Sequence, residues 1–272
     1  MTTVRCADAF DRARAENRRA LVGYLPAGFP SVDGAIGALR AMVEAGVDLV
    51  EVGLPYTDPV VDGPTIQAAA EIALRAGTRI RDVLATVEAV ASTGTPTVVM
   101  TYWNPVLRYG VEAFTADLAA AGGAGLITPD LIPDEAAGWI AASDAAGLDR
   151  VFLVSPSSTD RRIAAAAAAC RGFVYATSVM GVTGARARTS DLAPALVSRV
   201  RAASDLPVGV GLGVSNGDQA AAVAFYADAV IVGSAFVRRI LDAGDEPAGI
   251  AAAAELARDL AGGVRRAPAP AG

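Results

Sequence analysis

Two carboxylates, Glu51 and Asp62, are the side chains of this 272-residue sequence that best suit chemistry. Glu51 stands inside the run LVEVG (residues 49–53), which is otherwise typical of a buried strand. Because side chains alternate along a strand, Glu51 shares a face with Leu49 and Gly53, and the two valines point the other way. A carboxylate at such a place is costly unless it is paired. We therefore expect either a raised pKa and acid–base work, or an ion pair with an arginine.

Asp62 lies eleven residues further on, in the loop PYTDPVVDGP (residues 55–64). An isolated Asp-Gly pair would predict only a turn. Beside a buried glutamate, however, Asp62 completes a pair of acids in different environments. Such a pair can divide proton donation and proton acceptance between its two members.

The composition restricts the chemistry further. All 23 basic side chains are arginines, because the sequence contains no histidine and no lysine. This excludes a Schiff base, covalently held pyridoxal phosphate and a Ser-His-Asp triad. Cys6 and Cys170 lack the spacing of a zinc site, so we expect no metal and two reduced thiols.

The charge and hydropathy patterns narrow the cellular setting. The formal charge of −6 is spread along the chain, and no arginine cluster suits a nucleic-acid backbone. No apolar run approaches the roughly 18–20 residues of a membrane span. We expect a cytoplasmic protein that binds neither nucleic acid nor membrane.

Eight short apolar runs must position the two acids, and helical patterns rich in alanine separate them. Runs that are apolar nearly throughout are typical of parallel strands covered on both faces. Eight such units in roughly 250 residues predict an α/β fold, a (β/α)8 TIM barrel, ahead of a doubly wound open sheet. The predicted strands are residues 20–24, 49–53, 97–102, 125–128, 150–154, 173–176, 207–211 and 229–232.

The remaining segments complete a single predicted domain, residues 1–261. Residues 1–18 predict an extra N-terminal helix that closes the barrel floor through Phe10. The long gap between the second and third strands predicts an additional helix, with residues 78–91 as its second half. Residues 262–272, rich in proline, alanine and glycine, predict a disordered tail.

Glycine-rich segments follow the last three predicted strands, at residues 181–184, 208–217 and 231–235. Small residues let backbone N–H groups and a helix N-terminus converge on an anion. Barrel enzymes commonly bind a substrate phosphate at this place. Tight turns between strand and helix are the alternative explanation.

Residues 49–67 (LVEVGLPYTDPVVDGPTIQ) resemble the family of tryptophan synthase α subunits. Further motifs of that family recur in order at residues 181–185 (GVTGA), 211–215 (GLGVS) and 232–235 (VGSA). The resemblance implies a lyase of tryptophan biosynthesis. Its reaction is the retro-aldol-type cleavage of indole-3-glycerol phosphate to indole and glyceraldehyde 3-phosphate, with no cofactor in this chain.

The resemblance also implies a role for each site residue. Glu51 is the implied acid–base group at indole C3 and the glycerol hydroxyl, and Asp62 the implied partner of the indole N–H. The implied substrate-binding residues are Tyr24, Met100, Tyr175, Thr183 and Leu212, and the implied phosphate-binding residues are Gly184, Gly213, Gly233 and Ser234. Where this chain has Tyr24, Met100 and Leu212, the family often has Phe, Leu and Phe, which alters the stacking geometry of an apolar indole pocket.

A partner is implied as well. It is a β subunit that carries pyridoxal phosphate, in an α2β2 complex through which indole passes. The implied β-facing residues are Asp58, Pro59, Asn104, Pro105, Pro133 and Glu135, on loops that follow strands.

Two other functions share part of this pattern. A phosphosugar isomerase on the same barrel would use the phosphate site and a carboxylate pair, but it does not explain the run from Glu51 to Gln67. A non-catalytic barrel that activates a partner enzyme would need none of Glu51, Asp62 and Thr183. The sequence therefore favours the lyase.

Overall fold

The computed structural model describes residues 4–177 and 189–267. Eight parallel strands form a closed barrel in sequence order, with β1 paired to β8, which confirms the predicted TIM barrel. The strands are β1 (Ala20–Pro26), β2 (Leu49–Gly53), β3 (Thr97–Met100), β4 (Gly125–Thr128), β5 (Asp149–Val154), β6 (Val174–Thr177), β7 (Val208–Gly211) and β8 (Ala229–Val232).

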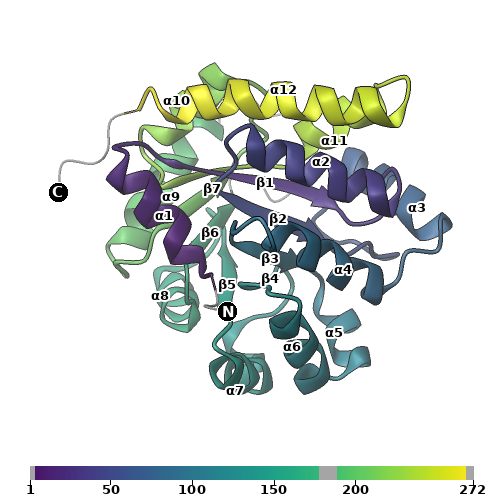
Figure 1. Ribbon diagram of the computed structural model, residues 1–272. Helices are drawn as coiled ribbons and strands as arrows, with labels where there is room; N and C mark the ends of the chain where they lie inside the picture. The colour runs from purple at the N-terminus through teal and green to yellow at the C-terminus, as the bar shows by residue number, and fades with distance from the viewer. Residues whose placement is uncertain (1–3, 178–188, 268–272) are drawn as a thin grey trace.

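Helices surround this barrel (Figure 1), and two of them fill the long gap between β2 and β3 as predicted. The helices are α1 (Cys6–Ala15), α2 (Val32–Glu44), α3 (Pro64–Arg75), α4 (Ile80–Ala91), α5 (Trp103–Tyr109), α6 (Val111–Ala120), the 3-10 helix η1 (Pro133–Glu135), α7 (Ala137–Ala146), α8 (Asp160–Ala169), α9 (Thr189–Arg201), α10 (Gly217–Ala224), α11 (Ser234–Leu241) and α12 (Glu246–Val264). Within residues 4–177 and 189–267, every helix is too short or too polar to cross a lipid bilayer.

Helix ends follow the local sequence. Ser31 begins α2 by accepting a hydrogen bond from the N–H of Gly34 at 2.9 Å, and Pro64 occupies the first turn of α3, where its missing N–H costs nothing. The third strand is shorter than the predicted range 97–102. It ends at Met100, because Tyr102 is the N-cap of α5.

Alternation along the strands divides the apolar residues into two clusters. Leu49 belongs to the cluster inside the barrel, and Val50 and Val52 belong to the cluster between the barrel and its helices. Glu51 therefore points into the barrel interior, as its sequence position predicts. It lies level with Tyr24 of β1 and Val98 of β3.

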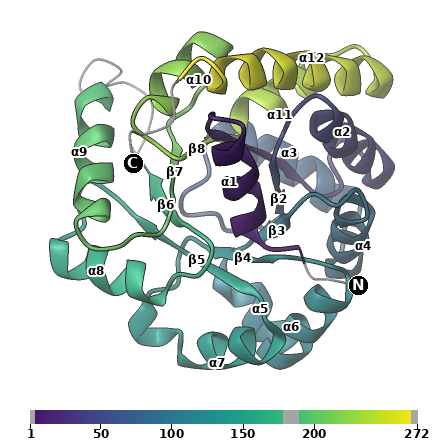
Figure 2. The ribbon, with the colours of Figure 1, turned by 60° about the vertical axis from the view of Figure 1, so that its left-hand side comes forward.

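Helix α1 lies across one end of the barrel, inside the ring of outer helices (Figure 2). Phe10 on this helix is buried, and its ring centroid lies 5.5 Å from that of Phe173. The N–H of Cys6 donates to Asp149 Oδ2 at 2.9 Å, which fixes the start of the helix to β5. The extra N-terminal helix thus closes the barrel floor, as predicted.

The predicted start of a disordered tail at Gly262 is wrong. Helix α12 continues to Val264, and both Val264 and Ala267 are buried. Gly263 explains the difference, because a Cβ atom there would lie 2.2 Å from the backbone oxygen of Gly217. The glycine that resembles a tail in the sequence instead lets α12 pack closely on α10. Residues 268–272 lie outside the described residues.

A buried ion pair joins the chain before β1 to the chain before β2. The Arg18 side chain is 4% exposed and donates to both carboxylate oxygens of Asp48, at 2.7 and 2.8 Å. Asp48 also accepts the N–H of Leu21 at 2.9 Å. The pair therefore fixes the relative position of two neighbouring strands at the end of the barrel opposite to their carboxyl ends.

We expect Arg18→Met to lower the free energy of unfolding by about 3–5 kcal/mol, because it leaves the Asp48 carboxylate buried without its cation. Urea unfolding of the purified chain measures this change. The matched control is Arg14→Met, which removes an exposed pair with Asp11 and should cost less than about 1 kcal/mol. Equal effects of the two substitutions would contradict the structural role of Arg18.

Candidate active site

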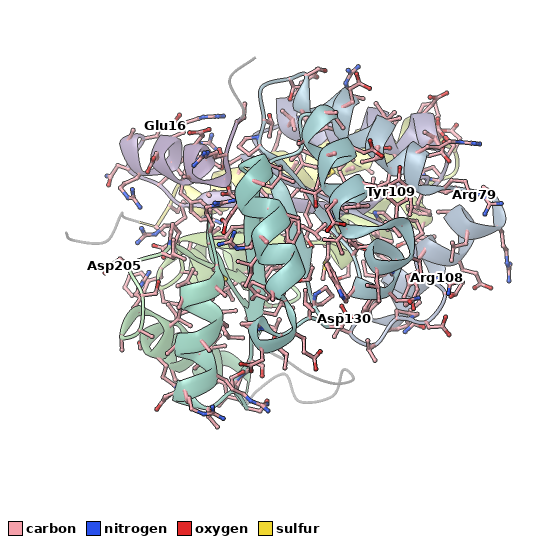
Figure 3. All side chains as sticks on the ribbon, turned by 90° about the horizontal axis from the view of Figure 1, so that it is seen from below. Glu16, Arg79, Arg108, Tyr109, Asp130 and Asp205 are labelled. Carbon is pink, nitrogen blue, oxygen red and sulfur yellow. The ribbon has the colours of Figure 1, made fainter. Side chains whose placement is uncertain are left out.

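A cavity of about 700 Å3 opens at the carboxyl ends of the strands. Figure 3 separates the two ends of the barrel: Arg108 and Asp130, which follow β3 and β4, lie across the molecule from Glu16 and Asp205, which precede β1 and β7. The sequence-predicted residues that line this one cavity are Tyr24, Glu51, Asp62, Met100, Tyr175, Gly213, Gly233 and Ser234. Parallel strands thus bring residues far apart in the sequence to one site.

Glu51 is 1% exposed, and its Oε2 atom has no hydrogen-bond partner in the described part of the chain. Burial, and then the charge of Asp62, raise the pKa of Glu51 to about 8. The alternative of a structural ion pair with arginine is not formed among the described residues. Glu51 is therefore a carboxylic acid that keeps its proton at neutral pH and faces the cavity.

Asp62 occupies the loop between β2 and α3. Its backbone oxygen accepts a hydrogen bond from Gln67 Nε2 at 2.8 Å, which ties the loop to the first turns of α3. Partial burial raises the pKa of Asp62, and a hydrogen bond with Tyr102 lowers it, with a net increase. The two acids thus differ in their surroundings: Glu51 is enclosed and has no ion-pair partner among the described residues, and Asp62 is partly exposed and hydrogen-bonded.

Two tyrosines form the apolar wall of the cavity together with Met100. Burial raises the pKa of Tyr24 and of Tyr175 well above the ordinary value, so both hydroxyls stay protonated. A glycine makes room for each ring. A Cβ atom added at Gly53 would lie 2.4 Å from the Tyr24 hydroxyl, and one added at Gly211 would lie 2.7 Å from the Tyr175 hydroxyl. A flat aromatic ligand suits these walls.

Another part of the cavity lining is built from backbone. Gly213 adopts a φ of +66°, a left-handed conformation that favours glycine, and Gly233 is the N-cap of α11. Ser234 begins that helix, whose first N–H groups have no acceptor within the helix. Such a helix start attracts an anion. Thr183 and Gly184, predicted for the same site, lie outside the described residues.

Leu212 is the exception among the predicted pocket residues. It is partly buried against the cluster between the barrel and its helices, and it is not among the described residues that line the cavity. Strand alternation explains this placement, because Gly211 faces the cavity and the next side chain points outward.

Several polar lining residues were not predicted from the sequence. They are Thr65, Ser155, Ser157, Ser158, Arg162, Thr177 and Arg238. Their positions in the sequence could have indicated them. Ser155 to Ser158 directly follow β5, and Arg238 lies one helical turn after Ser234 on the same face of α11. Arg238 donates to Thr65 Oγ1 at 2.7 Å, so it joins α11 to the start of α3 beside the cavity.

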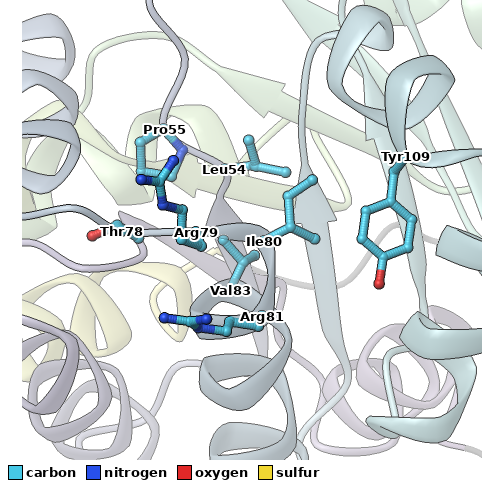
Figure 4. A pocket seen from close by; sticks show the side chains of 8 residues that line it. All are labelled: Leu54, Pro55, Thr78, Arg79, Ile80, Arg81, Val83 and Tyr109. Carbon is cyan, nitrogen blue, oxygen red and sulfur yellow. The ribbon is translucent and has the colours of Figure 1, made fainter.

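A second cavity, of about 410 Å3, lies between the loop after β2 and α4 (Figure 4). Its lining includes Leu54, Val83, Tyr109 and the arginines Arg79 and Arg81, with no carboxylate. It therefore lacks the acids that the first cavity offers. Within the described ranges, no group of three or more Cys, Asp or Glu side chains suits a metal ion.

The six predicted partner-facing residues lie at the same end of the barrel, but only Asp58 and Pro59 are on a loop as predicted; Asn104 and Pro105 belong to the first turn of α5, and Pro133 and Glu135 to η1. Asp58, Asn104 and Glu135 are exposed, and the three prolines are partly exposed. Large apolar side chains beside them are also exposed: Val60 by 76%, Leu107 by 59% and Ile132 by 50%. Exposed apolar side chains gathered around a rim are typical of a protein–protein interface.

Comparison with known proteins gives a consistent result. Residues 10–264 match the family described as "Tryptophan synthase alpha chain". The chain is 65% identical to the tryptophan synthase alpha chain of Salinispora tropica and 64% identical to that of Acidothermus cellulolyticus. Each alignment covers 96% of this chain, with 98% of the first relative and 97% of the second.

Solved structures agree with these sequence relatives. A tryptophan synthase structure from Mycobacterium tuberculosis superimposes with a TM-score of 0.90 at 58% identity, covering 97% of this chain and 99% of that chain. The alpha subunit from Legionella pneumophila superimposes with a TM-score of 0.87 at 29% identity, covering 95% and 97%. With the paired acids, the aromatic wall and the anion-binding backbone, these matches lead to one conclusion: the chain belongs to the tryptophan synthase alpha chain family.

Proposed function

We propose that this chain cleaves indole-3-glycerol phosphate to indole and glyceraldehyde 3-phosphate, with Glu51 and Asp62 as its catalytic residues. Its family makes it the carbon–carbon lyase subunit of tryptophan biosynthesis. The observation that carries the residue assignment is the unpaired, buried carboxyl of Glu51 in the same cavity as Asp62. Two acids with different surroundings suit a reaction in which the substrate gains one proton and loses another.

The proposed mechanism begins with Glu51 in its protonated form. Glu51 donates its proton to C3 of the indole ring, which leaves positive charge on the ring nitrogen. The Asp62 carboxylate stabilises that charge by accepting a hydrogen bond from the indole N–H. Glu51, now ionised, takes the proton of the hydroxyl on the adjacent glycerol carbon. The C–C bond breaks, its electrons restore the indole ring, and an aldehyde forms.

The remaining cavity residues hold the two ends of the substrate. We place the indole ring against Tyr24, Met100 and Tyr175, which form an apolar wall. We place the phosphate at the backbone N–H groups of Gly213, Gly233 and Ser234, with Thr183 and Gly184 as further proposed contacts. Binding energy from the phosphate end then orients the bond that breaks.

A β subunit is the partner of this family. We propose that it binds the rim that carries Asp58, Pro59, Asn104, Pro105, Pro133 and Glu135. We propose an α2β2 complex in which indole passes directly to the β subunit. Pyridoxal phosphate belongs to that subunit, since this chain has no lysine to hold it. The free, buried thiols of Cys6 and Cys170 suit the reducing cytoplasm in which we place the complex.

Glu51→Gln and Asp62→Asn should each reduce turnover by roughly 10²–10⁴-fold, because each removes one acid from the pair while keeping its size. A coupled assay for glyceraldehyde 3-phosphate measures the loss, and assembly with the β subunit serves as the folding control. Near-normal rates in both variants would refute the assignment. Failed assembly would indicate structural roles instead.

Glu51→Gln should also stabilise the fold at alkaline pH. The folded pKa of Glu51 is about 8, above the ordinary value of 4.5, so between these values only the unfolded chain releases the proton. Rising pH therefore favours unfolding of the wild type across this window, and the glutamine variant lacks the effect. We expect the variant to gain on the order of 2–5 kcal/mol over the wild type between pH 5 and pH 9.

Urea unfolding at several pH values measures this gain. Glu112→Gln, which replaces an exposed carboxylate on α6, is the control and should show no such gain between pH 5 and pH 9. A constant difference between wild type and Glu51→Gln would show that Glu51 is not a buried, neutral acid.

Docking of the β subunit should accelerate cleavage, because the proposed interface and the catalytic loops share one rim. Leu107→Asp should weaken binding of the β subunit at least tenfold and remove the acceleration. Phe225→Asp, equally apolar and 74% exposed after α10, is the control and should leave both unchanged. Equal turnover with and without the β subunit would contradict the coupling.

A further inference from the structure

Tyr102 does not line the main cavity, yet its hydroxyl contacts the loop that carries Asp62. It is the N-cap of α5, and only 4% of its surface is exposed. Its ring packs on that of Tyr56, with centroids 5.2 Å apart and planes inclined by 32°. The Tyr56 hydroxyl in turn accepts a hydrogen bond from Asn104 Nδ2 at 3.2 Å. These contacts hold the Tyr102 ring in one orientation.

The loop that carries Asp62 is hydrogen-bonded to the Tyr102 hydroxyl. It accepts the N–H of Val60 at 3.1 Å and the N–H of Val61 at 3.0 Å. A phenol oxygen has two lone pairs and a single proton, so these bonds leave only the proton free. The Asp62 side chain is hydrogen-bonded to Tyr102 as well, and a carboxylate is an acceptor. The phenol proton is therefore the part of the hydroxyl that can face the Asp62 carboxylate, whose pKa Tyr102 lowers.

This loop has little else to hold it in place. Val60 and Val61 are exposed, so neither side chain anchors the loop by burial. The backbone bonds to Tyr102 and the bond from Gln67 to the Asp62 oxygen are the fixed points of residues 60–62 in the described part of the chain. A loop with few buried contacts opens easily when such a bond is lost.

We propose that Tyr102 is the positioning residue of the site: its hydroxyl anchors residues 60–62 and directs the Asp62 carboxylate into the cavity. The effect on the reaction rests on the proposed function, in which ionised Asp62 accepts the indole N–H. The anchoring itself does not depend on any reaction. Tyr102 touches Asp62 and its loop, and Asp62 contacts the substrate.

Tyr102→Phe tests the proposal, because it keeps the buried ring and removes only the hydroxyl. In the complex with the β subunit, we expect kcat to fall about ten- to a hundredfold, as for loss of a hydrogen bond to a charged group, with a much smaller change in KM. The acidic limb of the kcat/KM profile should move to higher pH, since the bond to Tyr102 lowers the pKa of Asp62. A purely structural ring would give neither change.

Tyr109→Phe is the matched control. It also removes a tyrosine hydrogen bond to a carboxylate, that of Asp117 at 2.5 Å, but it lies at the far end of α5 and outside the main cavity. We expect its kcat and its pH profile to match the wild type. An unchanged kcat and pH profile in Tyr102→Phe would overturn the positioning role.

Hydrogen exchange separates the anchoring from the reaction. In Tyr102→Phe the amides of Val60 and Val61 should exchange at least about tenfold faster than in the wild type, because both lose their acceptor. Unchanged exchange would overturn the proposal even if activity fell. If the wild type failed to cleave indole-3-glycerol phosphate, the proposed function would fail, and faster exchange in Tyr102→Phe would still establish the anchor.

Discussion

The structure depends on one costly arrangement, a carboxyl group inside a barrel with one oxygen that no group in residues 4–177 and 189–267 hydrogen-bonds. Glu51 sits on β2 between Tyr24 and Val98, and strand pairing on both sides prevents it from turning toward solvent. Burial keeps its proton on at neutral pH. A chain with neither histidine nor lysine obtains in this way an acid whose pKa lies near neutrality.

The buried charged groups at the two ends of the barrel differ in how well they are paired. At the floor, Arg18 and Asp48 form a buried pair with two short hydrogen bonds, and Asp149 accepts the N–H of Cys6. At the carboxyl ends of the strands, the part of the chain that the structure describes offers Glu51 no ion-pair partner, and Asp62 is only partly compensated. The closed sheet connects the two ends. The hydrogen-bonded charges at the floor therefore help to stabilise a fold whose other end carries an energetically unfavourable buried acid.

Strand alternation and strand count were enough to predict the barrel and the orientation of Glu51. They could not predict features that depend on where an element ends. Tyr102 was expected at the end of a strand, but it begins a helix, and its contacts with residues 60–62 follow from that position. Gly263 was assigned to a tail because composition does not show that two helices approach at that glycine. Arg238 was missed because its contact with Thr65 joins helices far apart in the sequence.

The glycines around the cavity have a consequence for redesign. Tyr24 fills the space that a side chain would need at Gly53, on the neighbouring strand β2, and also at Gly233, directly after the other neighbouring strand, β8. Residues 24, 53 and 233 therefore share one volume for their side chains. An enlargement at residue 53 requires residue 24 to move or to become smaller, and one at residue 233 presses on the same ring, so mutational libraries that vary one position at a time exclude pocket shapes that paired changes would allow.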